Sequence, residues 1–360
     1  MEAEAIRLKF EGLLLGMAVG DALGLPGEQL HPKRARLLLG EPPLEHAFLF
    51  GKGMCSDDTE HLCMTSQALL KHPDDEEHFI RDLAWRLRAW FLLFPAGMGF
   101  ATLRSMCKLW LGFSPRRSGV FSAGNGPAMR APVLGAFLSK DISLMKSFVK
   151  ASTVISHTHP QAFDGALTIA LAARHSFLSS PEELDRDAFF EVLFAHLEVS
   201  ENIELMKKVQ AHLEIESTPE ALAQALGLER GVSGYINHTV PMCIFCWLRF
   251  PSDFRKALEA MILLGGDTDT TGGILGALVG AHLGADAIPD SWVNGIAEYP
   301  RSVSWLRRLA TALAENDNGS NQRQHDSVRL SWWVLPFRNV FFLAVVLFHG
   351  FRRLFPPYGK

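Results

Sequence analysis

Small residues recur with a helical period near both ends of the chain. One series of glycines stands every four residues at positions 12, 16, 20 and 24, and a second stands at positions 272, 276, 280 and 284. This spacing places each series on one face of a helix. Each glycine costs a helix about 1 kcal/mol relative to alanine, so a compensating gain is needed. We therefore expect two core helices that cross closely, in the simplest case with each other.

Between the two glycine series the apolar residues keep a helical period, and convincing alternating strands are missing. The helices expected from this period are Glu76–Phe94, Ala101–Leu111, Ala128–Leu138, Ile142–Ser152, Gln161–Phe177, Pro181–Ser200, Glu201–Glu214, Pro219–Leu226 and Ser252–Leu264. The main loops between elements are Leu25–Pro43, Gly112–Pro127 and Gly227–Asn237. We predict an all-α domain with its polar chemistry on loops and helix starts.

The C-terminal part of the chain changes character twice. Glu315–Arg329 is polar and has no apolar period, which is typical of a flexible linker. We therefore expect a catalytic domain at 1–314, a linker at 315–329 and a hydrophobic, aromatic tail at 330–360. The uninterrupted apolar stretch of the tail is too short to span a bilayer, and Arg338 would cost ~2.5–3.5 kcal/mol at its centre. Three placements of the tail stay open. In decreasing order of preference, it packs against the domain or a partner, lies on a membrane surface, or spans the membrane.

Composition excludes some classes of protein. The formal net charge is −4, and no basic run precedes the extreme C-terminus, so nucleic-acid binding is not expected. Five cysteines and a short, charged Met1–Lys9 predict a cytoplasmic protein without a secretory leader. Cys243 and Cys246 have redox spacing but lie in a hydrophobic run without a second pair. We expect buried, inert thiols there.

Two distant clusters combine carboxylates with hydroxyls. Asp267 and Asp269 lie in Gly265–Gly273, directly before an apolar run, which taken alone is typical of a capped helix start. A second cluster far upstream, Gly53–Glu60, repeats the chemistry with two adjacent aspartates, a serine and a threonine. Oxygen ligands of this kind favour a hard cation, Mg²⁺ first and Mn²⁺ or Ca²⁺ as alternatives. Four carboxylates suffice for two ions.

Five short blocks, in this order along the chain, resemble the ADP-ribosylglycohydrolase family. They are Gly16–Gly24 followed by Glu28, Ser56–Glu60, Gly124–Arg130, Ser156–Pro160 and Gly265–Thr270, with Ile288, Pro289 and Trp292 after the last. Any one block is weak, whereas all five together are highly specific. The resemblance covers Phe10 to Ala314 and leaves the tail outside. It implies a compact, orthogonal multi-helix bundle with a loop-lined cleft for two metal ions.

The resemblance also implies roles for individual residues. The side chains expected to hold a binuclear magnesium centre are Ser56, Asp57, Asp58, Asp267, Asp269 and Thr270. Ser56 stands where the family more often has threonine, a change that keeps the hydroxyl. Glu28 matches a mobile glutamate that acts as acid or base in the eukaryotic-type members. Nitrogenase-type members use an aspartate elsewhere, but the corresponding stretch here, Pro95–Phe100, has no carboxylate. Glu28 is therefore the candidate catalytic residue.

A glycine-rich loop, Ser122–Met129, precedes an apolar helix. It is either an ordinary loop or a place where backbone amides approach a diphosphate. His157 and His159 taken alone are typical of core or capping histidines. The contacts to phosphate or ribose that the resemblance implies are Gly124, Asn125, Gly126 and His157. Asp21, on the first glycine helix, is expected to support the site from behind.

The expected reaction is Mg²⁺-dependent hydrolysis of an N- or O-glycosidic bond at C1 of the distal ribose in an ADP-ribosylated protein or small molecule. A two-metal phosphohydrolase of a nucleotide diphosphate and a catalytically silent ADP-ribose-binding protein stay open as alternatives. The sequence does not choose the acceptor. We expect the loops Leu25–Pro43 and Lys108–Gly119 to select it.

Overall fold

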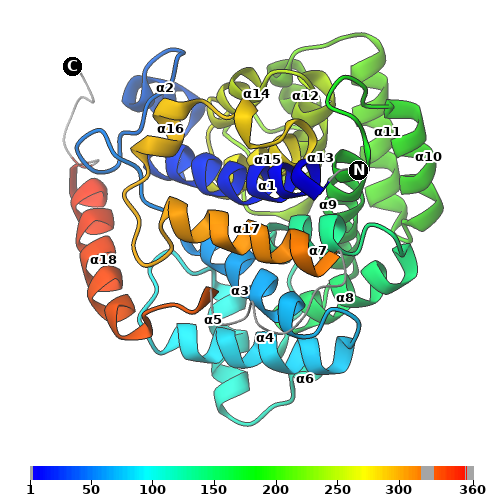
Figure 1. The fold of residues 1–360 in the computed structure, drawn as a ribbon. Helices are drawn as coiled ribbons and strands as arrows, with labels where there is room; N and C mark the ends of the chain where they lie inside the picture. The colour runs from blue at the N-terminus through cyan, green and yellow to red at the C-terminus, as the bar shows by residue number, and fades with distance from the viewer. Residues whose placement is uncertain (1–2, 318–327, 353, 355–360) are drawn as a thin grey trace.

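Two antiparallel helices, α1 (Ala3–Gly24) and α15 (Thr268–Leu283), lie against each other at the centre of the protein (Figure 1). In the computed structural model, which describes residues 3–317, 328–352 and 354, the two backbones touch. A Cβ atom added to Gly16 would lie 2.1 Å from the carbonyl oxygen of Gly276. The predicted close crossing of the two glycine helices is therefore confirmed, and they cross with each other.

The remaining helices pack around this pair. They are α2 (Pro32–Leu39), α3 (Asp57–Lys71), α4 (Glu76–Phe91), α5 (Phe100–Trp110), α6 (Pro115–Ser118), α7 (Ala131–Phe137), α8 (Ile142–Val154), α9 (Pro160–Leu178), α10 (Arg186–His196), α11 (Ser200–Glu214), α12 (Pro219–Ala225), α13 (Ile236–Arg249), α14 (Phe254–Ile262), α16 (Asp290–Gly295), α17 (Val303–Asp317) and α18 (Leu335–Arg352). Short 3-10 turns are η1 (Leu25–Gly27), η2 (Ala128–Arg130), η3 (Ala285–Ala287) and η5 (Trp332–Val334). Over the described residues the only β-structure consists of isolated β-bridges, which confirms the all-α fold.

The predicted helix boundaries differ from the observed ones in places with identifiable causes. Helix α10 begins at Arg186 rather than at Pro181, because the Asp185 side chain accepts the Ala188 amide and caps the first turn. Helix α2 lies within the predicted loop Leu25–Pro43, where the His31 side chain accepts from the Lys33 amide. Helix α6 lies in a second predicted loop. Helix α13 was not predicted, because Pro241 in its interior obscures its period.

The cysteine prediction holds within this core. All five cysteines are free thiols, and Cys243 and Cys246 are buried on α13. Burial raises the pKa of both thiols, so they stay protonated near neutral pH. They are core residues.

The C-terminal segment forms a helix at the edge of the molecule. Helix α17 continues to Asp317, inside the predicted linker, and residues 318–327 lie outside the described part of the chain. Helix α18 then runs along one side of the body (Figure 1). The centroid of the Phe342 ring lies 5.5 Å from that of Phe48, and the His349 imidazole stacks on Phe48 with the ring centroids 4.9 Å apart. The helix is thus docked through one face.

Candidate metal centre

The antiparallel pairing of α1 and α15 brings the segment after α1 beside the acidic cluster Gly265–Gly273. The Thr268 hydroxyl donates to the carbonyl of Gly24, at 2.6 Å, where α1 ends and α15 begins. The next residues are then tied by two backbone hydrogen bonds, from Gln29 to Gly266 at 2.7 Å and from Gly266 to Leu30 at 2.8 Å. As a result, carboxylate oxygens of Glu28, Asp267 and Asp269 lie within 4.8 Å of one another.

The acidic cluster Gly53–Glu60 contacts the cluster Gly265–Gly273 through the start of α3. Ser56 is the N-cap of this helix, and its hydroxyl oxygen accepts the Asp58 amide at 3.2 Å. The Asp58 Oδ2 atom accepts hydrogen bonds from Ser56 Oγ at 2.9 Å and from Thr270 Oγ1, on α15, at 3.1 Å. Two clusters about 200 residues apart in sequence therefore share one hydrogen-bonded carboxylate.

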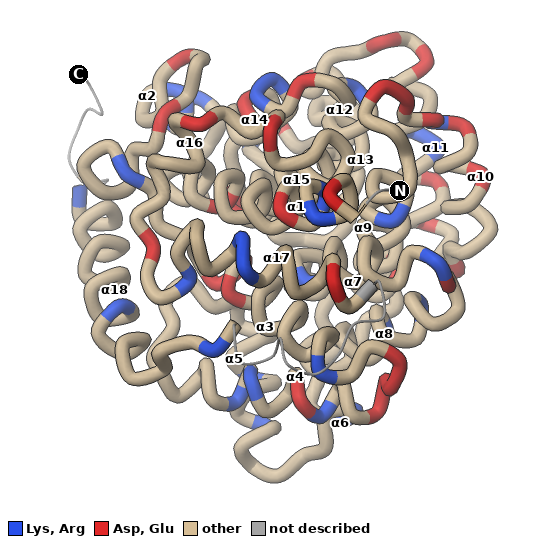
Figure 2. The backbone as a smooth tube through the Cα atoms, in the orientation of Figure 1, with Lys and Arg blue, Asp and Glu red and all other residues tan. Residues whose placement is uncertain are grey.

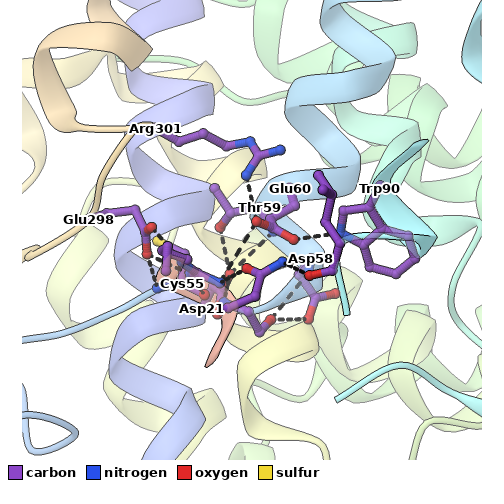
Figure 3. Close-up of polar contacts among 12 residues, drawn as sticks. Asp21, Cys55, Asp58, Thr59, Glu60, Trp90, Glu298 and Arg301 are labelled. Atoms are coloured by element: carbon purple, nitrogen blue, oxygen red, sulfur yellow. Dashed lines mark hydrogen bonds and ion pairs between the residues drawn. The ribbon is translucent and has the colours of Figure 1, made fainter. Parts of the chain in front are cut away.

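Asp21 supports the start of α3 from behind, as Figure 3 shows. Its carboxylate is fully buried on α1 and accepts the Ser56 amide at 2.9 Å. It also accepts the amide and the hydroxyl of Thr59, at 3.2 and 2.5 Å. Burial raises the pKa of Asp21 to about 6, and these hydrogen bonds oppose that rise. The side chain thus fixes the backbone that presents Asp57 and Asp58.

A cleft of about 320 Å³ is lined by five carboxylates, from Glu28, Asp57, Asp58, Asp267 and Asp269. Among the described residues that line it there is no lysine or arginine. Two of the oxygens, Asp58 Oδ1 and Asp269 Oδ1, are buried without a hydrogen-bond partner. Buried anionic oxygens without partners are strongly unfavourable unless a cation accompanies them. The donor set, carboxylates with the hydroxyl of Thr270, fits a hard cation such as Mg²⁺.

Burial and mutual repulsion raise the pKa values of these carboxyl groups. Burial raises the pKa of Asp57 to about 8, and Glu60, Asp21 and Glu28 add to the rise. The pKa values of Asp58 and Asp269 lie well above 3.8, first because of burial and then because of neighbouring carboxylates. The metal-free cluster therefore holds protons near neutral pH.

We expect Mg²⁺ to bind more tightly at about pH 8 than at about pH 6, because the ion must displace the protons that the raised pKa values of Asp57 and its neighbours retain. Calorimetric titration in two buffers of different ionisation enthalpy measures the proton release. Equal binding heats in both buffers, together with equal affinity at both pH values, would contradict this prediction.

The predicted substrate loop closes the other side of the cleft. The Asn125 side chain donates to Asp267 Oδ2 at 2.6 Å, so the loop is tied directly to the acidic cluster. Gly124 and Gly126 lie over the buried His157 ring, where added Cβ atoms would come within 2.9 and 3.1 Å of it. Burial, with a contribution from Arg130, lowers the pKa of His157 to about 3. Any contact that His157 makes with a phosphate is therefore that of a neutral imidazole.

Several placements differ from expectation. Asp267 stands at the N-cap position of α15, but its side chain makes no capping hydrogen bond, so the simple helix-cap interpretation of this residue is wrong. Ser56, expected as a metal ligand, is buried and does not line the cleft. The described loop Lys108–Gly119 contributes no lining residue either. Instead, the start of α5 does, with Phe100 84% exposed. Its only signal in the sequence was a pair of glycines, Gly97 and Gly99, before an apolar helix.

Comparison with known proteins adds to this geometry. A family model described as ADP-ribosylglycohydrolase matches residues 2–323. An uncharacterized protein of Archaeoglobus fulgidus is 31% identical over 314 residues, which cover 85% of this chain and 96% of that protein. ADP-ribosylhydrolase ARH3 of Gallus gallus is 29% identical, over 85% of this chain and 93% of its own length. ADP-ribosyl-dinitrogen reductase glycohydrolase of Rhodospirillum rubrum is 26% identical, over 83% and 95%.

The fold has a counterpart among solved structures. A chain described as an ADP-ribosylglycohydrolase-related protein complex superimposes with a TM-score of 0.64 at 25% sequence identity. The match covers 87% of this chain and 99% of that one. Helix α18 lies beyond the residues that the family model matches.

Proposed function

Because this chain belongs to the ADP-ribosylglycohydrolase family, whose members hydrolyse ADP-ribose linkages, we propose that it is a Mg²⁺-dependent enzyme that removes ADP-ribose from an acceptor. The observation that carries the proposal is the cleft with five carboxylates and no lysine or arginine among its described lining. Such a cleft repels an anionic diphosphate unless bound cations change its charge. The substrate would be an ADP-ribosylated protein or small molecule, and the protein would act in the cytoplasm.

The residues of the cleft divide into groups by position. Those that would hold two Mg²⁺ ions are Asp57, Asp58, Asp267, Asp269 and Thr270, with Ser56 fixing the orientation of Asp58. When bound, the ions would supply Lewis-acid stabilisation and lower the pKa of a coordinated water. Glu28 would hold the proton that is given to the leaving group or taken from water. Asn125 would orient the substrate while its amide stays bonded to Asp267.

The experiment is incubation of the protein with Mg²⁺ and with arginine-, serine- and nucleic-acid-linked ADP-ribose, followed by analysis of the products. Free ADP-ribose that appears with Mg²⁺ and not with excess EDTA supports the proposal. Release of AMP would instead identify a phosphohydrolase. Binding of ADP-ribose without turnover of any substrate would identify a catalytically silent binding protein.

We expect Glu28→Gln to lower turnover by roughly 10²–10⁴-fold, because the amide cannot transfer a proton. Mg²⁺ affinity should change little, since the four aspartates remain. The exposed Glu45, in the segment between α2 and α3, is the control for the same substitution, and Glu45→Gln should retain full activity. A collapse of Mg²⁺ affinity in Glu28→Gln would make Glu28 a metal ligand, which its proximity to Asp267 and Asp269 allows.

A further inference from the structure

The inward face of α18 reaches the backbone that supports the acidic cluster. Arg338 is nearly buried, and its guanidinium binds both oxygens of the Glu298 carboxylate, at 2.8 and 2.7 Å. The same guanidinium donates to the carbonyl of Cys55 at 2.5 Å. The second Glu298 oxygen accepts the Cys55 amide at 3.1 Å. Both backbone polar groups of Cys55, the residue before Ser56, are thus held by one buried ion pair.

The same ion pair belongs to a larger buried network beneath the first turn of α3 (Figure 3). Glu60 accepts from Arg301 and from the Trp90 indole, each at 2.5 Å. Its carboxylate also lies 3.8 Å from the Arg338 guanidinium. Two carboxylates and two guanidiniums therefore balance one another, and loss of one cation leaves a buried anion without compensation. For loss of Arg338 that anion is Glu298, whose second oxygen accepts the Cys55 amide.

We propose that Arg338 is a positioning residue for the metal centre, acting through Cys55 and Glu298 on the backbone that carries Ser56, Asp57 and Asp58. The inference rests on the proposed metal centre and adds to it a residue from outside the family-matched part of the chain. Residues that orient metal ligands in this way commonly change metal affinity by about 10–100-fold when they are replaced.

The test compares full-length wild-type protein with Arg338→Met and Arg338→Lys, by calorimetric titration with MgCl₂ and by thermal unfolding. Arg338→Met should weaken Mg²⁺ binding by about 10-fold or more at a temperature where it is folded. Arg338→Lys should lie in between, because lysine keeps the charge but not the planar fork. The exposed Arg352→Met, at the end of the same helix, is the matched control and should bind Mg²⁺ like the wild type.

The outcomes separate the inference from the proposed function. If the wild type binds no Mg²⁺, the proposed metal centre fails. If the wild type binds and Arg338→Met binds equally well with a lower melting temperature, Arg338 is only a structural residue and the inference is overturned. Tighter binding by Arg338→Met would also overturn it, because the effect would then be the loss of a repulsive positive charge.

The outward face of α18 carries a second, independent observation. The large apolar side chains exposed by 50–73% on this face and on the preceding turn η5 are Trp332, Trp333, Phe337, Val340, Phe341, Leu347, Phe348 and Phe351. The polar residues Asn339 and His349 are buried, with Asn339 donating to the carbonyl of Leu93 at 2.7 Å and His349 bonded to the carbonyl of Phe48 at 2.6 Å, whereas Arg352 is exposed at the end of the helix. A helix that packs on a soluble core normally presents charged and polar residues on its outer face, whereas the outer face of α18 is largely apolar.

Charge indicates what covers this face. Figure 2 marks no acidic residue on α18, and none occurs in residues 330–360, although the chain as a whole has a net charge of −4. Arg352 and Arg353 follow the apolar residues at one end, and two tryptophans precede them at the other. Aromatic residues beside basic ones are typical of helices that lie on anionic bilayers. We infer that this face binds the surface of an anionic lipid membrane.

Trp332–Arg352 is long and apolar enough to span a bilayer by length and composition alone. Spanning would require Arg338, Asn339 and His349 to leave their partners on the body. Lying on the surface keeps those contacts and buries the outward side chains.

Sedimentation with phosphatidylcholine vesicles, with and without phosphatidylglycerol, tests this surface. We expect binding to the anionic vesicles, and a loss of about 10-fold or more in Phe341→Ser/Phe348→Ser. Ile215→Ser removes an equally exposed apolar side chain at the end of α11 and should bind like the wild type. Absence of vesicle binding by the wild type would overturn the assignment. So would a wild-type protein that is a dimer in solution and becomes a monomer in the double variant, because the face would then bind a second copy of the chain.

Discussion

Asp269→Asn is expected to reduce turnover by about 10²-fold or more and to remove most Mg²⁺ binding, while raising the melting temperature of the metal-free protein. The two effects have opposite signs because the carboxylate is harmful to the fold without a cation. Asp269 Oδ1 is buried without a hydrogen-bond partner. Burial raises its pKa well above 3.8, and Glu28, Asp267, Asp58 and Asp21 add to that rise. Asparagine has the same shape and no charge.

The stability gain should depend on pH with a definite sign. A carboxyl group whose pKa is raised by folding stabilises the protein when protonated, and this contribution is lost as pH rises through the folded pKa. Wild type and Asp269→Asn should therefore melt alike in acid, and the variant should melt increasingly above the wild type as the pH rises. Thermal unfolding in EDTA across the pH range measures the difference.

Asp187→Asn is the matched control, because this exposed aspartate also lies in the first turn of a helix, α10. It should lose only the small favourable interaction with the helix dipole, roughly 0.3–1 kcal/mol, and keep full activity. A metal-free Asp269→Asn protein that is less stable than the wild type at pH 8 would show that the carboxylate has a structural partner instead.

The fold was largely predictable because its principal contact, between α1 and α15, depends on glycines that can be recognised in the sequence. A glycine every four residues has few explanations in a helix interior, and Gly16 and Gly276 prove to face each other across touching backbones. The acidic residues were recognisable because paired aspartates with hydroxyls occur twice, at Gly53–Glu60 and at Gly265–Gly273, whereas either cluster alone is typical of a capped helix start. Helix α13 was missed because Pro241 contradicts the local rule, and only the surrounding core makes a helix there favourable.

The supporting contacts were not predictable from the sequence. Arg338 lies 283 residues from the Cys55 carbonyl that it binds, and no local pattern links the two. The capping role of Asp267 followed from local rules that tertiary structure overrides, since Asn125 takes the carboxylate instead. The segment Lys108–Gly119, expected to help select the acceptor, contributes no residue to the lining of the cleft. This segment includes the end of α5 and the short helix α6, and its position relative to the cleft depends on how α5 is oriented.

Gly16→Ala is expected to lower the free energy of unfolding by about 3 kcal/mol or more and the melting temperature by at least about 5 °C. The new Cβ would lie 2.1 Å from the carbonyl oxygen of Gly276, so the two central helices must separate. Gly350→Ala is the matched control. It lies within α18, where an added Cβ meets nothing within 4 Å, and alanine should leave stability unchanged or raise it by roughly 0.5–1 kcal/mol.

The same substitution should weaken the metal centre from a distance. Helix α1 carries Asp21 and leads into Glu28, and α15 begins beside Asp267 and carries Asp269, so the contact between the two helices contributes to the spacing of these carboxylates. We therefore expect the folded Gly16→Ala protein to bind Mg²⁺ about 10-fold more weakly, measured by titration well below its melting temperature. Normal Mg²⁺ affinity in a strongly destabilised Gly16→Ala protein would mean that the ligands are positioned locally, by Asp21 and Asn125, and that the glycine helices contribute stability alone.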